Sequence, residues 1–188
     1  MSFGLERGEI AVVEATGREA KLALMDLVLG ERMPEKGAIL LQDKQLENTA
    51  PGCIGWVPEN GGLINNLKVW ENITLPLWYH GSYLPRQAEE TAQRWLGTLG
   101  LDAGEWSDFM ACQPAMLEMG ERKLAGLLRG LVQAPVLLVV DAALFEGITE
   151  AAAQHWMKAL ELFVQEAGER AVLVISDHAA LLPWRKIE

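Results

Sequence analysis

Residues 14–22, Glu-Ala-Thr-Gly-Arg-Glu-Ala-Lys-Leu, carry the pattern in this chain that comes nearest to a known chemical site. They lie between a continuous apolar run and a helical pattern, the usual place of the phosphate loop G-x-x-x-x-G-K-[ST], whose glycines let backbone N–H groups surround phosphate oxygens. Alanines occupy both glycine positions, Lys21 occupies the lysine position, and Leu22 replaces the hydroxyl that would hold Mg²⁺. Glu14 and Glu19 add negative charge. The candidate nucleotide-binding residues are Gly17, Ala20, Lys21 and Leu22; the alternative is that Lys21 is a solvated lysine at a helix start.

Three further polar groups follow apolar runs. Asp141 ends the run VLLVVD, where it could ligate Mg²⁺ through water or cap the next segment. Glu59 lies in the polar turn after residues 53–57. His178 beside Asp177 suggests acid–base chemistry, although Ser-Asp is also a common N-cap for a following helix. Ligands bind at the carboxyl ends of parallel strands, so we expect these groups to lie at one edge of a sheet.

The elements that would position these groups alternate between strand and helix. Apolar runs predict strands at residues 9–14, 37–42, 53–57, 136–141 and 171–176. Apolar periodicity predicts helices at residues 19–29, 69–78, 85–99, 118–132 and 149–168. This order is typical of an α/β domain with a mostly parallel sheet covered on both faces. The helix-rich stretch from about residue 67 to 132 interrupts the order and predicts an inserted α-helical subdomain.

Composition restricts the possible partners. Asp and Glu outnumber Lys and Arg by 26 to 16, a net charge of −10 that would repel a nucleic-acid backbone. No apolar run approaches the roughly 20 residues that a membrane-spanning helix needs, and the N-terminus has no signal-peptide pattern. Cys53 and Cys112 form no CxxC pair, and nothing has the spacing of a metal site. We therefore expect a cytoplasmic protein that inserts into no membrane and reaches one only through a partner.

From residue 1 to about 183 the chain resembles the ATP-binding subunits of ABC transporters, and within them those of Mla-type phospholipid transporters with MCE-protein partners. The register and spacing of several segments carry this resemblance: SFGLERGEI, LVLGERMPEKGAILLQDKQL, GWVPENGGLINNLKVWENITLPL, RKLAGLLRGLVQAPVLLVVDAALFEGIT and AVLVISDH. The resemblance implies a P-loop NTPase-like fold in a single domain. A RecA-like core would take residues 1–66 and 133–188, and the helical subdomain residues 67–132.

The resemblance also shows which functional positions have changed. Glu59 takes the place of the Q-loop glutamine. The signature motif, which in the family binds the γ-phosphate of the nucleotide on the partner subunit, falls at about residues 116–120, and Leu117 and Glu118 cannot bind a phosphate there. Asp141 is kept from Walker B, but Ala142 replaces the catalytic glutamate. Ile148 takes the D-loop aspartate position and Asp177 the switch-histidine position, with His178 one place late. The strands that usually precede the Walker A loop, with an aromatic that stacks on adenine, are expected to be absent.

These departures predict a degenerate subunit that does not hydrolyse ATP. No resident metal or cofactor is expected, and binding of MgATP belongs to the alternative below. It would dock on an integral membrane permease at the inner face of the cell membrane, in lipid-type transport, beside a second ATPase subunit or another copy of itself. Two alternatives remain: an ATP-binding subunit completed by its partner, and a soluble adaptor outside transport. The well-kept segment 65–77 borders the docking groove in the family. The predicted docking residues, in this segment and directly after it, are Asn65, Leu67, Val69, Trp70, Asn72, Leu75 and Trp78. For Trp70 and Trp78, core packing is the alternative.

Overall fold

The computed structural model describes residues 2–178 and 182–187. Within these residues five strands form one sheet in the order β4-β5-β6-β1-β7, and every neighbouring pair is parallel. The strands are β1 (Ile10–Glu14), β4 (Ile54–Val57), β5 (Leu137–Asp141), β6 (Ala171–Ser176) and β7 (Arg185–Ile187). All six residues of β6 are buried, as expected for a strand with both neighbours paired and both faces covered. The predicted α/β fold is confirmed.

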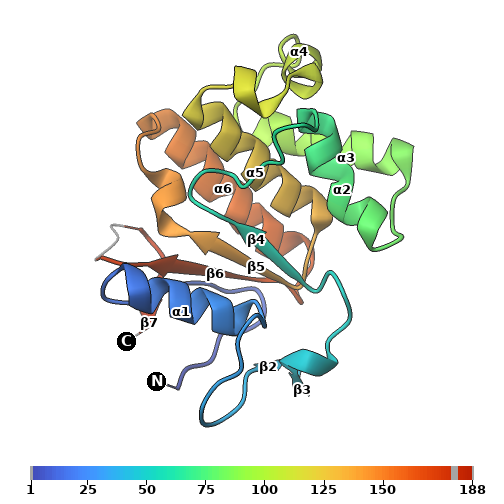
Figure 1. The fold of residues 1–188 in the computed structure, drawn as a ribbon. Helices are drawn as coiled ribbons and strands as arrows, with labels where there is room; N and C mark the ends of the chain where they lie inside the picture. The colour runs from blue at the N-terminus through green and yellow to red at the C-terminus, as the bar shows by residue number, and fades with distance from the viewer. Residues whose placement is uncertain (1, 179–181, 188) are drawn as a thin grey trace.

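Helices cover the two faces of the sheet unequally (Figure 1). On one face α1 (Arg18–Val28) packs through Met25 and Val28 against Val13 and Ile175. On the other face lie α5 (Met119–Gln133) and α6 (Glu150–Glu166), in a larger core that includes Leu128. Beyond α5, and packed on it, are α2 (Val69–Tyr79) and α3 (Pro85–Thr98), with the short α4 (Trp106–Ala111) beside α2. The helix-rich stretch therefore forms a layer of its own, and its exact boundaries remain a prediction.

One predicted strand is present only in part, outside the main sheet, and two strands were not predicted. Residues 37–42 contribute only β2 (Leu40–Leu41), which pairs antiparallel with β3 (Lys44–Gln45) in a separate hairpin. The reason is local: Gln42 and Asp43 have φ of 51° and 63°, so the chain reverses in a two-residue turn of type I′ character instead of entering the sheet. The two unpredicted strands are β3, which completes this hairpin, and β7, which is three residues long and mostly exposed.

Short 3₁₀ helices complete the connections, and η3 (Ala142–Phe145) contributes to the site. Helix η3 follows β5 directly, and η2 (Pro114–Met116) precedes α5; the third, η1 (Leu46–Asn48), follows β3. No helix in the described part of the chain is long and apolar enough to cross a membrane.

Candidate functional site

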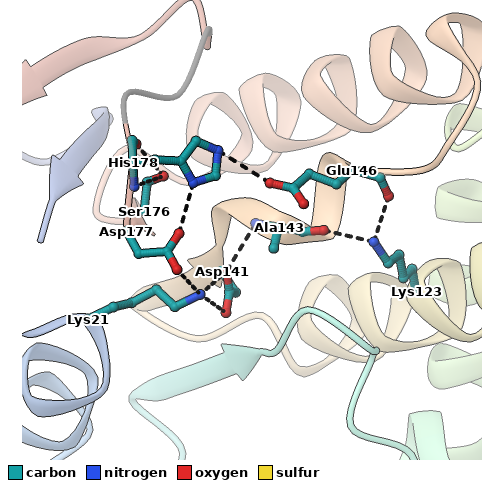
Figure 2. A network of polar contacts seen from close by, with 8 residues as sticks. All are labelled: Lys21, Lys123, Asp141, Ala143, Glu146, Ser176, Asp177 and His178. Atoms are coloured by element: carbon teal, nitrogen blue, oxygen red, sulfur yellow. Dashed lines mark hydrogen bonds and ion pairs between the residues drawn. The ribbon is translucent and has the colours of Figure 1, made fainter. Parts of the chain in front are cut away.

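The carboxyl ends of β1, β5 and β6 meet at one edge of the sheet, with Glu14 opposite Ser176 and Asp141 opposite Ile175. Lys21, in the first turns of α1, reaches into this edge (Figure 2). Its Nζ lies 3.2 Å from Oδ1 and 3.1 Å from Oδ2 of Asp141, and the two side chains are only 8% and 6% exposed. The predicted convergence of Lys21 and Asp141 therefore exists as a buried ion pair.

Asp141 has a second contact that fixes its carboxylate. Its Oδ1 accepts a hydrogen bond of 3.0 Å from the N–H of Ala143, so Asp141 is the N-cap of η3. Both oxygens of the carboxylate thus bind groups of the protein. Of the two roles considered from sequence, the capping role is present in the structure.

Asp177, His178 and Glu146 extend this polar network toward the surface (Figure 2). The Oδ2 of Asp177 lies 3.8 Å from the amine of Lys21, and its Oδ1 lies 2.9 Å from Nδ1 of His178. The hydrogen bond with the His178 side chain, aided by the charge of Lys21, lowers the pKa of Asp177. Nε2 of His178 is 3.4 Å from a carboxylate oxygen of Glu146. Both ring nitrogens of His178 therefore face carboxylates of the chain itself.

The helix that Ser176 and Asp177 were considered to cap is not found where the chain is described. The hydroxyl of Ser176 instead donates to the carbonyl of His178 at 2.7 Å and closes a local turn. Residues 179–181 lie outside the described residues, and residues 185–187 form β7.

Lys123 is a site residue that the sequence analysis did not identify. It lies on the buried face of α5, 7% exposed, and its Nζ donates to the carbonyls of Ala143 and Glu146 at 2.7 Å each. Burial lowers the pKa of Lys123, while the charges of Glu146, Glu59 and Asp141 oppose this shift. Lys123 thereby ties η3 to α5. The signal for it in the sequence is a lysine among the apolar residues of an amphipathic helix.

The connection between β1 and α1 has only three residues, Ala15–Gly17. Two of its N–H groups bind carbonyls of the protein: Ala15 donates to Ser176 at 2.8 Å and Gly17 to Asp177 at 3.2 Å. The N–H of Lys21 donates to the carbonyl of Gly17, because α1 already begins at Arg18. Gly17 has φ of 89°, which explains the glycine at this turn. Ala20 is exposed, and Leu22, where a Mg²⁺-binding hydroxyl was sought, is 44% exposed.

The turn that carries Glu59 is fixed against α5. Glu59 itself is exposed, but a Cβ on Gly61 would lie 2.0 Å from the carbonyl oxygen of Arg122, so the turn and the helix touch backbone to backbone. The guanidinium of Arg129 donates to the carbonyls of Gly61 and Gly62 at 3.0 and 2.7 Å. Burial lowers the pKa of Arg129. This turn is therefore held by specific contacts.

Carboxylates also occupy the start of α5, the predicted place of the signature. Glu118 is the N-cap, and its N–H donates to Oε2 of Glu121 at 2.8 Å in a reciprocal capping box. Leu117 is buried. Ala142, which is buried, and Ile148, which packs against the main core, have no polar side chain to offer at their positions.

The charge balance of the site is negative. The ammonium groups of Lys21 and Lys123 lie among four carboxylates, those of Asp141, Asp177, Glu146 and Glu59. A phosphate group would therefore enter a field of its own sign. In the described residues no group of three or more His, Cys, Asp or Glu side chains is arranged to hold a metal ion.

The structure divides the seven predicted docking residues into two groups. Val69 and Asn72 are fully buried, so they cannot belong to a docking surface. The amide of Asn72 accepts from the N–H of Ile64 at 2.7 Å and donates to the carbonyls of Ile64, Leu67 and Lys68 at 3.0–3.1 Å, which gives it a structural role inside the segment. The remaining predicted residues are exposed or half-buried: Asn65, Leu67, Trp70, Leu75 and Trp78.

The family model described as "ABC transporter" matches residues 1–144. The chain is 26% identical over 190 residues to the formylaminopyrimidine import ATP-binding protein ThiZ of Halalkalibacterium halodurans, with 98% of this chain and 70% of that protein covered. It is 27% identical over 190 residues to the Fe(3+) ions import ATP-binding protein FbpC of Pseudomonas fluorescens, covering 98% and 51%. To the lipoprotein-releasing system ATP-binding protein LolD of Idiomarina loihiensis it is 26% identical over 185 residues, covering 94% and 78%. The chain thus spans about half the length of the FbpC relative and more of the other two.

Solved structures agree on the fold. An ATP-binding subunit of an ABC transporter superposes with a TM-score of 0.79 at 18% identity, covering 94% of this chain and 71% of the other. For cbiO1 from Clostridium perfringens, part of an ABC transporter complex, the TM-score is 0.71 at 19% identity, with 96% and 72% covered.

Proposed function

Because the chain belongs to the ABC transporter family of ATP-binding domains, we propose that it serves as a degenerate subunit that docks on an integral membrane permease and does not hydrolyse ATP. The observation that carries this proposal is the state of Lys21. Its amine is buried and already held by Asp141 at 3.1 Å, with Asp177 at 3.8 Å.

The residues at this edge do not fit MgATP. Phosphoryl transfer in this fold depends on positioned N–H donors, a lysine, a metal-binding hydroxyl and a group that orients water. Here Lys21 would have to leave a buried partner, and breaking such a pair costs several kcal/mol. Leu22 has no hydroxyl, and Ala142 has no carboxylate. The surrounding carboxylates oppose a triphosphate.

In this proposal the ion pair of Lys21 with Asp141 stabilises the fold instead of binding a nucleotide. It joins α1 to the ends of β5 and β6 across the edge of the sheet. The scaffold would then stay assembled without a ligand and present a constant surface to the permease. The subunit would lie at the cytoplasmic face of the membrane, beside a second ATPase subunit or a second copy of itself.

The docking surface we propose is the exposed side of α2 and its approach. Leu75 and Trp78 are 37% and 62% exposed, although apolar, and they lie one turn apart on α2. Exposed apolar side chains at this spacing are a common contact surface for an amphipathic helix of a partner protein. The proposal of a lipid-type substrate rests on the resemblance of residues 1 to about 183 to the ATP-binding subunits of Mla-type transporters. Relatives of this chain carry names for several substrates, and one of them is named for lipoprotein release.

The test is purification of the tagged chain from membranes solubilised in detergent. We expect an integral membrane permease to co-purify, and Trp78→Glu to abolish this. The matched control is Leu40→Glu, another exposed apolar residue at 60% exposure on the separate β2–β3 hairpin, which should leave co-purification intact. A chain that stays alone in detergent would contradict the docking role. ATP turnover that disappears with Lys21→Ala would contradict the loss of hydrolysis.

A further inference from the structure

A pocket lined by aromatic rings lies in the helical layer, away from the edge of the sheet. It has a volume of about 460 Å³. Its walls come from the first turn of α2, the connection to α3, the first turns of α3, and α4, which lie together beyond α5 in Figure 1. The lining residues are Trp70, Tyr83, Pro85, Glu89, Trp106, Ser107 and Met110.

The pocket is built from side chains that the fold holds in place. Met110 is 8% exposed, and Trp70 and Trp106 pack partly into the main core. The ring of Tyr83 stacks on Trp78 with centroids 4.2 Å apart and planes 23° apart. The N–H of Val69 donates to the carbonyl of Cys112 at 2.9 Å, which joins the start of α2 to the end of α4.

The chemistry of this lining favours a cation. Faces of Trp and Tyr rings attract cations through their quadrupoles, and Trp does so most strongly. Glu89 adds a carboxylate that forms no salt bridge within the described residues, whereas its neighbour Glu90 binds Arg86 at 2.9 Å. The cation–π contacts found among the described residues use Trp95 and Phe163, so they leave the three rings of the pocket available.

The charge around the pocket is complementary to a cation as well. Between Arg94 and Arg122 the chain has no Lys, Arg or His, while Asp102, Glu105 and Asp108 lie in or next to α4. The chain therefore has no cation of its own along this stretch to occupy the pocket, and Arg86, in the first turn of α3, is already paired with Glu90. Glu89 is the charged residue in the lining itself.

We propose that this pocket accepts the side chain of an arginine, and, resting on the proposed docking function, that the permease presents it. A guanidinium is planar and weakly hydrated, so it stacks on aromatic rings while pairing with a carboxylate such as Glu89. The pocket wall continues through Tyr83 to the exposed Trp78, which belongs to the proposed docking surface. One protein segment could thus cover both features, with its apolar residues on α2 and its arginine in the pocket.

The test is NMR titration of the whole chain labelled with ¹⁵N, observing its tryptophan indole signals. The probes are Nα-acetyl-arginine amide and its neutral isostere Nα-acetyl-citrulline amide. We expect saturable shifts at Trp70 and Trp106 with the arginine probe and none with the citrulline probe. Glu89→Gln should weaken binding about three- to five-fold, the upper part of the range of an exposed ion pair, and the control Glu90→Gln should leave it unchanged.

Several results would overturn this inference: no saturable shift with the arginine probe, equal shifts with both probes, or an unchanged affinity in Glu89→Gln. Tetramethylammonium binding more tightly than the arginine probe would also overturn it, in favour of a small quaternary ammonium ligand. The probes require no permease, so the pocket and the docking function fail separately. A permease that co-purifies with a chain unable to bind the arginine probe would refute the pocket alone.

Discussion

Replacement of Lys21 by Met tests whether the ion pair at the edge of the sheet is a structural element. The substitution keeps the length of the side chain and removes the ammonium group, so the carboxylates of Asp141 and Asp177 lose the cation between them. The side chains of Lys21 and Asp141 are only 8% and 6% exposed. Removing one partner of a buried ion pair lowers the free energy of unfolding by about 3–5 kcal/mol. We expect a loss of this size in the free energy of unfolding.

A double-mutant cycle separates the pairing from the burial of each group. Asp141→Asn keeps an oxygen that accepts from the N–H of Ala143, and Asp177 remains near Lys21, so we expect a smaller loss of about 1–3 kcal/mol. The combination of Lys21→Met with Asp141→Asn should be less destabilising than the sum of the two by at least about 1 kcal/mol, because neither charge is then left alone.

The assay is urea unfolding followed by circular dichroism, comparing variants whose m-values agree. The matched control is Arg86→Ala, which removes the exposed Arg86–Glu90 pair and should cost only about 0.3–0.5 kcal/mol. A loss below about 1 kcal/mol for Lys21→Met, or strict additivity in the cycle, would refute the structural role of the pair.

Three further predictions use the same unfolding assay. Gly126→Ala should cost about 1–3 kcal/mol or more, because its Cβ would lie 2.3 Å from a backbone atom of the turn packed on α5, while Gly97→Ala, in open space on α3, should be neutral or stabilising; equal effects would contradict this. Glu9 has its pKa lowered from 4.5 mainly by a hydrogen bond with Arg185, so its stabilising contribution is complete above pH 4.5 and is lost as the pH falls through the lowered value. Glu9→Gln should therefore destabilise the chain at pH 7 and flatten the loss below pH 4.5; an unchanged pH profile would count against it. Asn72→Ala should cost roughly 2 kcal/mol or more by leaving the backbone groups that its buried amide binds unpaired, and a loss under about 0.5 kcal/mol would contradict its structural role.

Much of the fold could be predicted because the buried strands have a direct signature. The runs at residues 136–141 and 171–176 are apolar up to their last residue, since both faces of the sheet are covered, and both form strands. Residues 37–42 look similar, but the positive φ angles at Gln42 and Asp43 produce a hairpin, and the apolar run does not reveal this. The exposed β7 has no apolar run at all, so periodicity cannot detect it.

The candidate site could be predicted only in part, for a related reason. The carboxyl ends of parallel strands meet, which brings Lys21, Asp141 and Asp177 together as expected. The pairing of Lys21 with both carboxylates depends on where the ends of these side chains lie in space, and the spacing of residues along the chain does not predict those positions. Lys123 was missed because a lysine on a helix is ordinarily solvated, whereas here two carbonyls of η3 receive its amine. Asn72 was assigned to the surface because the sequence does not show that the preceding loop wraps around its amide.

Calorimetric titration of the purified chain with MgATP tests the central claim most directly. If Lys21 is held by Asp141 and Asp177 and the site repels phosphate, titration into the unmodified chain and into Lys21→Ala should give the same result, with no saturable heat up to millimolar nucleotide. Saturable binding at millimolar or tighter affinity that Lys21→Ala abolishes would show that the lysine leaves its carboxylates for phosphate. That result would contradict the account of this chain as a degenerate, non-hydrolysing subunit.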